Sequence, residues 1–187
     1  MKLYTIGHGN QTIESFVTIL KTYDIRCLLD VRSAPYSKYV PHFNKAYLEA
    51  ELPSFGLDYR YAGEHLGGRP KQAELYRQGT QISDQTDRDD YLKLVDYEAV
   101  MGQAWYGKAV VRLVQLVVET GERVCVMCSE SEPHDCHRHH LIARSLLDPS
   151  VQVADQITTV HHILKDGSTE VVTAETFTDQ PRQLSLF

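Results

Sequence analysis

The alternation of strand-like and helix-like runs is the feature that most restricts how this chain can fold. Short apolar runs of strand length alternate with amphipathic runs in which apolar residues recur at helical spacing. This order is typical of α/β domains, in which a mainly parallel sheet lies between two layers of helices. We therefore expect a single three-layer α/β domain over residues 1–177 with a C-terminal β-hairpin, followed by a short flexible tail over residues 178–187.

Local signals place the individual elements. Thr12 and Asn44 are candidate N-caps of two helices, and Gly121 is the candidate C-cap of another. Residues 71–90 are polar and show no clear period, so we expect an exposed excursion there. The predicted strands are Leu3–Ile6, Cys27–Val31, Leu57–Tyr61 and Arg123–Met127. The other predicted helices are Tyr91–Met101, Lys108–Thr120 and His137–Leu147, and the predicted hairpin is Thr158–Phe177 around Asp166-Gly167.

The composition indicates a globular protein of a reducing compartment. The 187 residues suffice for a hydrophobic core, and no apolar run is long enough to span a membrane. The first ten residues lack the charged-then-apolar order of a signal peptide, so we expect a cytoplasmic protein with no membrane partner. Its four cysteines are then expected to be thiols or metal ligands rather than disulfides. A net charge of −6 argues against a broadly basic surface but does not exclude a local basic groove.

Titratable residues and glycines follow the predicted strands at the points where the strands end. Ligands of parallel sheets bind beyond the carboxyl ends of the strands, so we expect these residues to line one cleft. Arg32 has the planar guanidinium that suits phosphate or carboxylate, and the glycines on both sides of His8 let a ligand approach the backbone. The alternatives are an ion pair of Arg32 with Asp30 or Glu64, and a simple turn at His8. The residues at these strand ends are His8, Asp30, Arg32, His65, Gly67, Gly68 and Glu130.

The stretch Cys125–His140 contains three of the four cysteines and four of the nine histidines. Tetrahedral zinc accepts both side chains, and Cys128, Cys136 and His137 are the candidate ligands. Cys125 is expected to point to the opposite face of its strand, into the core. The stretch also lacks the second paired knuckle of a structural zinc site. We therefore expect no resident metal, or a weakly held one, and keep an open site with these three ligands as the alternative.

Cys136 is the candidate nucleophile, because Cys136-His137-Arg138 opens a predicted helix whose dipole and free amides favour a thiolate or a bound anion. Structural roles are the alternative: Arg138 pairs with Glu130 or Asp30, and Cys136 is buried and inert. The candidate catalytic residues are His8, Asp30, Glu130 and Cys136. The candidate ligand-binding or phosphate-binding residues are Arg32, His65, Gly67, Gly68, His137 and Arg138.

Short motifs spread over nearly the whole chain resemble one prokaryotic family. The matching segments are Thr5-Ile6-Gly7-His8, Asp30-Val31-Arg32, Leu66-Gly67-Gly68, Tyr97 with Met101, Cys128-x-Glu130 and Cys136-His137-Arg138. The family that these segments resemble is catalogued as domain of unknown function 488, and the last two blocks make the resemblance specific. The resemblance implies a single α/β domain whose activity is not established.

Three functions agree with these residues. The first is an enzyme acting on a nucleotide or nucleic-acid substrate in DNA repair or modification, and the second is a non-catalytic module that binds such a ligand. The third is a rhodanese-like thiol or metal enzyme. The loop after Cys128 carries three carboxylates and no glycine, which disfavours the anionic intermediate of a sulfurtransferase. The sequence does not identify a cofactor.

Two further segments suggest partners. Aromatic and basic residues alternate over Tyr36–Lys45, as they do in sites for single-stranded nucleic acid, although such clusters also anchor loops. Gln183-Leu184-Ser185-Leu186-Phe187 is similar to the short motif by which bacterial replication and repair proteins dock on the DNA polymerase sliding clamp. The candidate clamp-binding residues are Gln183, Leu184, Leu186 and Phe187, and the alternative is that the tail packs on the domain itself.

Overall fold

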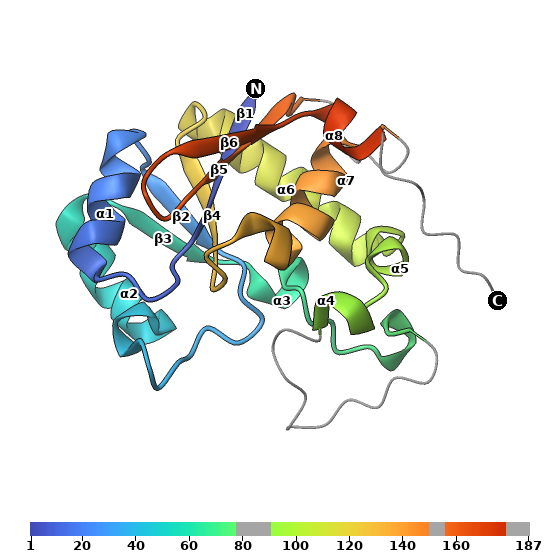
Figure 1. Ribbon diagram of the computed structural model, residues 1–187, viewed down its shortest axis with the longest axis horizontal. Coiled ribbons are helices and arrows are strands. Elements are labelled where there is room, and N and C mark those ends of the chain that lie inside the picture. Colours follow the sequence, from blue (N-terminus) through green and yellow to red (C-terminus); the bar gives the residue numbers. More distant parts are fainter. Residues whose placement is uncertain (78–90, 150–155, 179–187) are drawn as a thin grey trace.

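The computed structural model describes residues 1–77, 91–149 and 156–178. These residues form one six-stranded sheet in the order β3-β2-β4-β1-β5-β6 (Figure 1). Neighbouring strands are parallel except β5 and β6, which form an antiparallel hairpin. The strands are β1 (Lys2–Gly7), β2 (Cys27–Asp30), β3 (Asp58–Tyr61), β4 (Val124–Cys128), β5 (Thr159–Ile163) and β6 (Thr169–Val172). The expected α/β fold with a mainly parallel sheet and a C-terminal hairpin is therefore confirmed.

Helices cover both faces of the sheet, which is the middle of three layers (Figure 1). The helices are α1 (Ile13–Thr22), α2 (Lys45–Glu51), α3 (Gly63–Leu66), α4 (Tyr91–Leu94), α5 (Tyr97–Met101), α6 (Ala104–Thr120), α7 (Arg144–Leu147) and α8 (Ala174–Thr178). A π-helical segment, Arg138–Ala143, leads directly into α7. A hydrophobic core lies on each face of the sheet, and strand β4 contributes side chains to both. Cys125 and Met127 pack with α1 and α2, and Val124 and Val126 pack with α6 and α7. Cys125 belongs to the core, as the strand pattern predicts.

Several predicted ends of elements are present. Thr12 caps α1 by accepting a hydrogen bond from the Ser15 amide at 3.3 Å. Helix α6 ends at Gly121, whose φ of 63° is the left-handed conformation that glycine adopts without strain. The turn between β5 and β6 contains Gly167 at φ 83°. These three signals act over a few residues, and the sequence therefore shows them directly.

The structure differs from the prediction in four places. The Asn44 side chain does not cap α2 but accepts a hydrogen bond from the Ser37 amide at 2.6 Å. The single helix predicted for Tyr91–Met101 is two helices, because Asp96 starts a new one by accepting from the Ala99 amide at 3.0 Å. The helix predicted for His137–Leu147 is π-helical in its first part. The last part of the predicted hairpin is α8, which includes the first residue of the predicted tail. Residues 78–90 of the predicted excursion, and 179–187 of the tail, lie outside the described residues.

The connections diverge at β4. After β1 and β2 the chain enters α1 and α2 on one face of the sheet, whereas after β4 it enters the π-helical segment and α7 on the other face. Such a divergence leaves a crevice beyond the carboxyl ends of the strands concerned. Gly7 is in register with Cys128 and Asp30 with Met127, so these strands end at the same edge.

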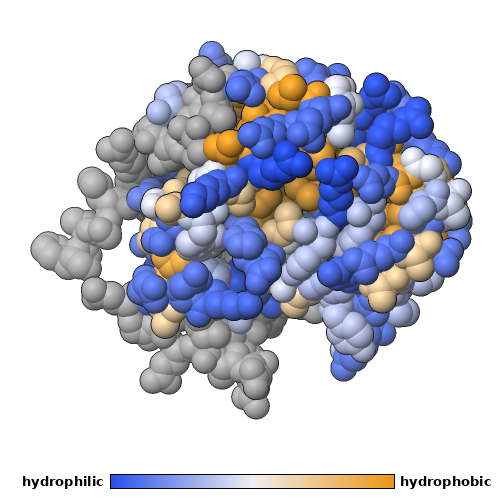
Figure 2. Space-filling view, turned by 180° about the vertical axis from the view of Figure 1, so that it is seen from behind, coloured by the Kyte–Doolittle hydropathy of each residue, from blue (hydrophilic) through white to orange (hydrophobic). Residues whose placement is uncertain are grey.

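The surface seen from behind is mostly hydrophilic, with hydrophobic residues gathered in its upper central part (Figure 2). The most exposed aromatic side chains of the described residues are Tyr36 and Tyr39, in the loop between β2 and α2. Among the described residues, no helix has the length and apolar character needed to cross a membrane.

Candidate functional site

A pocket lies at the carboxyl edge of the sheet, next to the end of β4. Five of the predicted site residues line it together with Cys128: Arg32, Gly68, Glu130, Cys136 and His137. The volume of the cavity is about 50 Å³, which has room for a few water molecules or for an ion beside one small chemical group. A whole nucleotide is too large to be enclosed there. Any larger substrate must therefore insert only its reacting group.

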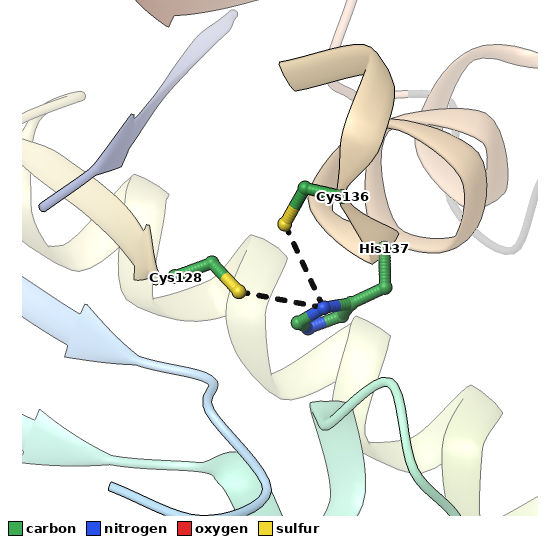
Figure 3. Close-up of side chains that lie close together, drawn as sticks. All are labelled: Cys128, Cys136 and His137. Carbon is green, nitrogen blue, oxygen red and sulfur yellow. Dashed lines mark hydrogen bonds between the residues drawn. The ribbon is translucent and has the colours of Figure 1, made fainter. Parts of the chain in front are cut away.

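Two thiols and one imidazole converge in this pocket (Figure 3). Cys128 is the last residue of β4, and Cys136 and His137 precede the π-helical segment. The Nδ1 atom of His137 lies 3.5 Å from the Sγ of Cys128 and 3.8 Å from the Sγ of Cys136. One donor atom from each of the three residues lies within 4.8 Å of the others, and all three residues are buried. The divergence after β4 thus brings together residues separated by an eight-residue step in the chain.

The spacing of this cluster matches a tetrahedral zinc site. Zinc–sulfur bonds of about 2.3 Å and zinc–nitrogen bonds of about 2.0–2.1 Å, at a tetrahedral angle, place S and N about 3.6 Å apart. The two observed S–N distances, 3.5 and 3.8 Å, lie on either side of this value. Cys128, Cys136 and His137 could therefore hold a metal ion with little rearrangement. They are the three ligands that the sequence analysis kept as its alternative.

The Glu130 carboxylate lies against both thiols. Its Oε2 atom accepts hydrogen bonds from Cys128 at 2.9 Å and from Cys136 at 3.2 Å. Burial raises the pKa of Glu130, but the hydrogen bond from Cys128 and the nearby His137 outweigh burial, and the net pKa is lowered. Burial, together with Cys128, raises the pKa of the Cys136 thiol well above its ordinary value. The carboxylate is therefore ionised, and the Cys136 thiol is protonated at neutral pH.

Backbone contacts fix the loop that carries Glu130. Arg138 is fully buried, and its Nη1 and Nη2 atoms donate to the backbone carbonyls of Glu130 and Ser131, the second at 2.7 Å. A Cβ atom at Gly7 would overlap the carbonyl oxygen of Glu130, so only glycine permits this approach. Arg138 therefore ties the loop to the helix, as in the structural alternative, with carbonyls rather than carboxylates as the acceptors.

Gly68 sets the position of the imidazole. A Cβ atom at this residue would lie 2.6 Å from Cγ of His137 and 2.9 Å from its Nδ1. The hydroxyl of Tyr97, which also lines the pocket, donates to the Gly68 carbonyl at 3.3 Å. The absence of a side chain at Gly68 thus leaves the space in which His137 faces the two thiols.

Arg32 lines the pocket, and buried hydrogen-bond partners fix its guanidinium group. Its Nε and Nη2 atoms donate to the Asp30 carboxylate at 2.9 and 2.6 Å, and Nη2 also donates to the Phe43 carbonyl at 2.7 Å. Nη1 lies 3.1 Å from the Nε2 of His8, whose Nδ1 is 2.8 Å from the Gly9 carbonyl. Burial, and then Arg32, lower the pKa of His8 to about 4, so this imidazole is neutral and accepts from Arg32.

Other predicted site residues lie outside the pocket. His8 and Asp30 are buried behind Arg32 and contact the pocket through it. The ion pair of Arg32 with Asp30 is the structural alternative proposed from the sequence. His65 is exposed and its ring lies 6.2 Å from that of Trp105. Gly67 packs against Ser33 instead of facing the cavity.

Sequence reasoning assigned no role in the site to Ser33 or Arg69 and did not predict that His139 and His162 meet. Ser33 and Arg69 line the pocket, and the Arg69 amide donates to the Ser33 hydroxyl at 3.0 Å. Their positions directly after Arg32 and Gly68 were the available signal. His139 and His162 are buried, with Nδ1 of the first 3.1 Å from Nε2 of the second. No sequence pattern indicates that two histidines 23 residues apart will meet.

Comparison with protein families identifies the family of this chain. The model of the family described as "Domain of unknown function DUF488" matches residues 12–145, well over half of the sequence. The chain belongs to the DUF488 family. The resemblance inferred from the motifs is thereby confirmed, and the match includes every residue of the Cys128, Glu130, Cys136 and His137 cluster. No curated protein and no solved structure matches this DUF488 chain.

Proposed function

We propose that this DUF488 protein is a metal-dependent hydrolytic enzyme that acts on a nucleotide or nucleic-acid substrate. Cys128, Cys136 and His137 hold a zinc ion, and Glu130 transfers protons beside it. The observation that carries the proposal is the spacing of the two sulfurs around Nδ1 of His137, at 3.5 and 3.8 Å. Three protein ligands leave the fourth position of a tetrahedral ion open, as in catalytic zinc sites.

The protonation states favour a metal site over a free nucleophile. A cysteine nucleophile must be a thiolate, but burial raises the pKa of Cys136. Each thiol instead donates to Glu130. A divalent ion would displace the protons of the coordinating thiols and balance the negative charge that two thiolates beside Glu130 would otherwise bury.

The chemistry follows from the positions of the protein groups. When bound, zinc lowers the pKa of a water ligand and so supplies a nucleophile at neutral pH. When the thiols lose their protons, they no longer donate hydrogen bonds to Glu130. The Glu130 carboxylate then remains in the lining of the pocket, able to accept another proton. Glu130 can take one proton from the attacking water as the water oxygen bonds to the electrophilic atom, and return that proton to the leaving group as the bond between this atom and the leaving group breaks. The Glu130 carboxylate thus acts first as the base and then as the acid, so the reaction requires no second acidic residue.

Positive side chains support a phosphate-bearing substrate. Arg32 and Arg69 both line the pocket. Four of the five N–H groups of Arg32 are used by Asp30, Phe43 and His8, which leaves one on Nη1 for an acceptor on the substrate. Because the cavity is small, the phosphates of such a substrate must remain outside the metal cluster, near the arginines.

Metal binding tests the site directly. We expect the purified protein to bind one zinc ion per chain, measured by elemental analysis after dialysis. Cys128→Ser and Cys136→Ser should each weaken zinc binding by more than about 100-fold, because loss of a ligand costs more than loss of an outer-shell partner. Cys125→Ala is the matched control, since Cys125 is a buried thiol of the same strand in the opposite core. A protein that binds no zinc, or loses it equally with Cys125→Ala, would contradict the proposal.

Cobalt substitution distinguishes a hydrolytic centre from a closed structural one. The visible spectrum of a Co²⁺-loaded protein should change when a small anion such as thiocyanate enters the open fourth position. Glu130→Gln should retain the metal and this response, while turnover of any hydrolysed substrate falls by about 100-fold or more. A cobalt spectrum that responds to no added anion would show a closed site and would exclude the hydrolytic role.

We also propose that the C-terminal segment recruits the enzyme to the sliding clamp. The support is its sequence, in which Gln183 and the apolar Leu184, Leu186 and Phe187 follow a polar stretch. A peptide with residues 179–187 should bind purified bacterial clamp, and the full chain should lose binding by about 10-fold or more when Leu186 and Phe187 are changed to alanine. Equal binding by the wild-type and doubly substituted chains would exclude this role.

A further inference from the structure

The loop between β2 and α2 begins at the pocket and presents two tyrosines to solvent. Ser33 and Ala34, at the start of this loop, line the cavity. Tyr36 and Tyr39 follow them, and their side chains are 68% and 81% exposed. Five residues of fully extended chain span about 18 Å, so Tyr39 lies within that distance of Ala34. In Figure 1 the loop between β2 and α2 lies at the lower left of the view.

Hydrogen bonds hold the backbone of this loop in place. The Ser37 side chain is buried, and its hydroxyl accepts from the amides of Tyr39 and Val40 at 3.2 and 3.3 Å. The Ser37 amide donates to the Asn44 side chain at 2.6 Å, and the Lys45 amide donates to the Pro35 carbonyl. Two exposed aromatic rings therefore project from a fixed backbone, which lowers the entropy lost when a ligand stacks on them.

The structure separates anchoring residues of the aromatic and basic run from exposed ones. Phe43 is completely buried, and its ring stacks on His8 with centroids 4.3 Å apart. His42 bonds through Nε2 to the Gln11 carbonyl at 2.8 Å. Phe43 and His42 are thus loop anchors, whereas the exposure of Tyr36 and Tyr39 has no such explanation.

Lys38 places a positive charge at the ring of Tyr39. Nζ of Lys38 lies 5.0 Å from the ring centroid of Tyr39, and no carboxylate of the described residues forms an ion pair with it. Lys45 lies 4.6 Å from the ring centroid of Tyr61 and shares its charge with Glu49 at 3.6 Å. Two exposed aromatic rings with a lysine at one of them differ from the apolar centre of a protein interface and resemble surfaces on which bases stack while a lysine meets a phosphate.

We infer that Tyr36 and Tyr39 form a stacking surface for single-stranded nucleic acid that leads into the pocket. The inference rests on the proposed function and specifies its substrate: bases stack on the two rings, Lys38 meets a backbone phosphate, and the neighbouring nucleotide extends its reacting group toward Cys128 and Cys136. A single strand fits because its bases are free to stack, whereas a duplex conceals them.

Fluorescence anisotropy with a labelled single-stranded oligodeoxynucleotide of about 12 nucleotides tests this surface. Tyr36→Ala and Tyr39→Ala should each weaken binding by about 5-fold or more, and the double variant by at least about 25-fold. Tyr36→Phe with Tyr39→Phe is the matched control and should bind like the wild type, because stacking requires the ring and not the hydroxyl. Lys38→Gln should reduce the slope of log affinity against log salt by about 0.7, and the tyrosine variants should leave that slope unchanged.

The inference would be overturned by unchanged affinity in the double alanine variant, by equal losses with alanine and phenylalanine, or by tighter binding of the duplex of the same sequence. An altered oligomeric state in the alanine variant, measured by light scattering, would instead identify a protein contact and would also overturn it. Zinc content separates this inference from the metal proposal, because the tyrosine variants should lose oligonucleotide affinity but keep one zinc ion per chain.

Discussion

Replacing Asp30 by asparagine is expected to lower the free energy of unfolding by about 3–5 kcal/mol, because it leaves the buried Arg32 cation without a compensating charge. Asp30 is completely buried and accepts hydrogen bonds from the backbone and side chain of Arg32 and from the hydroxyl of Tyr59, the last at 2.7 Å. The measurement is urea denaturation at neutral pH, monitored by circular dichroism.

The adjacent strand offers a matched control. Asp58 and Arg60 form an ion pair with the same sequence spacing, at 2.7 Å, but their side chains are 53% and 46% exposed. Asp58→Asn should therefore change the free energy of unfolding by less than about 1 kcal/mol. Similar losses for Asp30→Asn and Asp58→Asn would show that burial does not determine the contribution of the Asp30–Arg32 pair.

Acid is expected to destabilise the fold by about 5 kcal/mol between pH 7 and pH 4.5 through His139 and His162 alone. Burial is the main cause that lowers the pKa of His139 to about 3 and that of His162 to about 2. Both folded values lie below the ordinary pKa of about 6.5, so the unfolded chain binds protons first as the pH falls. Stability is therefore retained above about pH 6.5 and decreases from there toward the folded values.

Within the described part of the chain, no carboxylate contacts either of these two histidines in a way that would favour a charged imidazole. Nδ1 of His162 is 2.7 Å from the Thr5 hydroxyl, and the ring of His139 packs 5.2 Å from that of Phe177. The neighbouring groups that oppose their protonation are His134, His140, His161 and Arg138. Glu170 is the nearby carboxylate, and it pairs with His134 at 2.8 Å.

Urea denaturation at the two pH values tests this dependence. His139→Gln should reduce the difference between them by about 2.5 kcal/mol, whereas His65→Gln should change it by less than about 0.5 kcal/mol because His65 is exposed. An unaltered pH dependence in His139→Gln would mean that this buried pair does not govern acid unfolding.

Local sequence patterns predicted most helices and strands, but they did not predict contacts between segments that are far apart in the sequence. Thr12 and Gly121 act on their own helices, so their roles were visible in sequence. Asn44 fits the same rule for caps, but the Ser37 amide competes for its side chain. The insertion of β4 between β1 and β2 depends on how all the helices pack, and no periodicity encodes it.

The candidate site was partly foreseeable for the same reason. Parallel strands end at one edge, and this rule placed Arg32, Gly68 and Glu130 together. It did not show that Asp30 and His8 would bind the Arg32 guanidinium instead of lining the pocket, because strand ends alone do not give side-chain directions. The close fit of Gly68 against His137 was also invisible, since it depends on a contact between segments almost seventy residues apart.

The strand order also affects how the chain can fold during synthesis. The first strand, β1, lies inside the sheet, where Tyr4 is in register with Cys125 on one side and His161 on the other. At about 5–20 residues per second, a ribosome needs roughly 6–25 s to add the residues that separate β1 from its first partner. During that time both edges of an apolar strand are unpaired. Cys128 emerges with that partner strand, so the thiol cluster is completed only as the nascent chain closes its sheet.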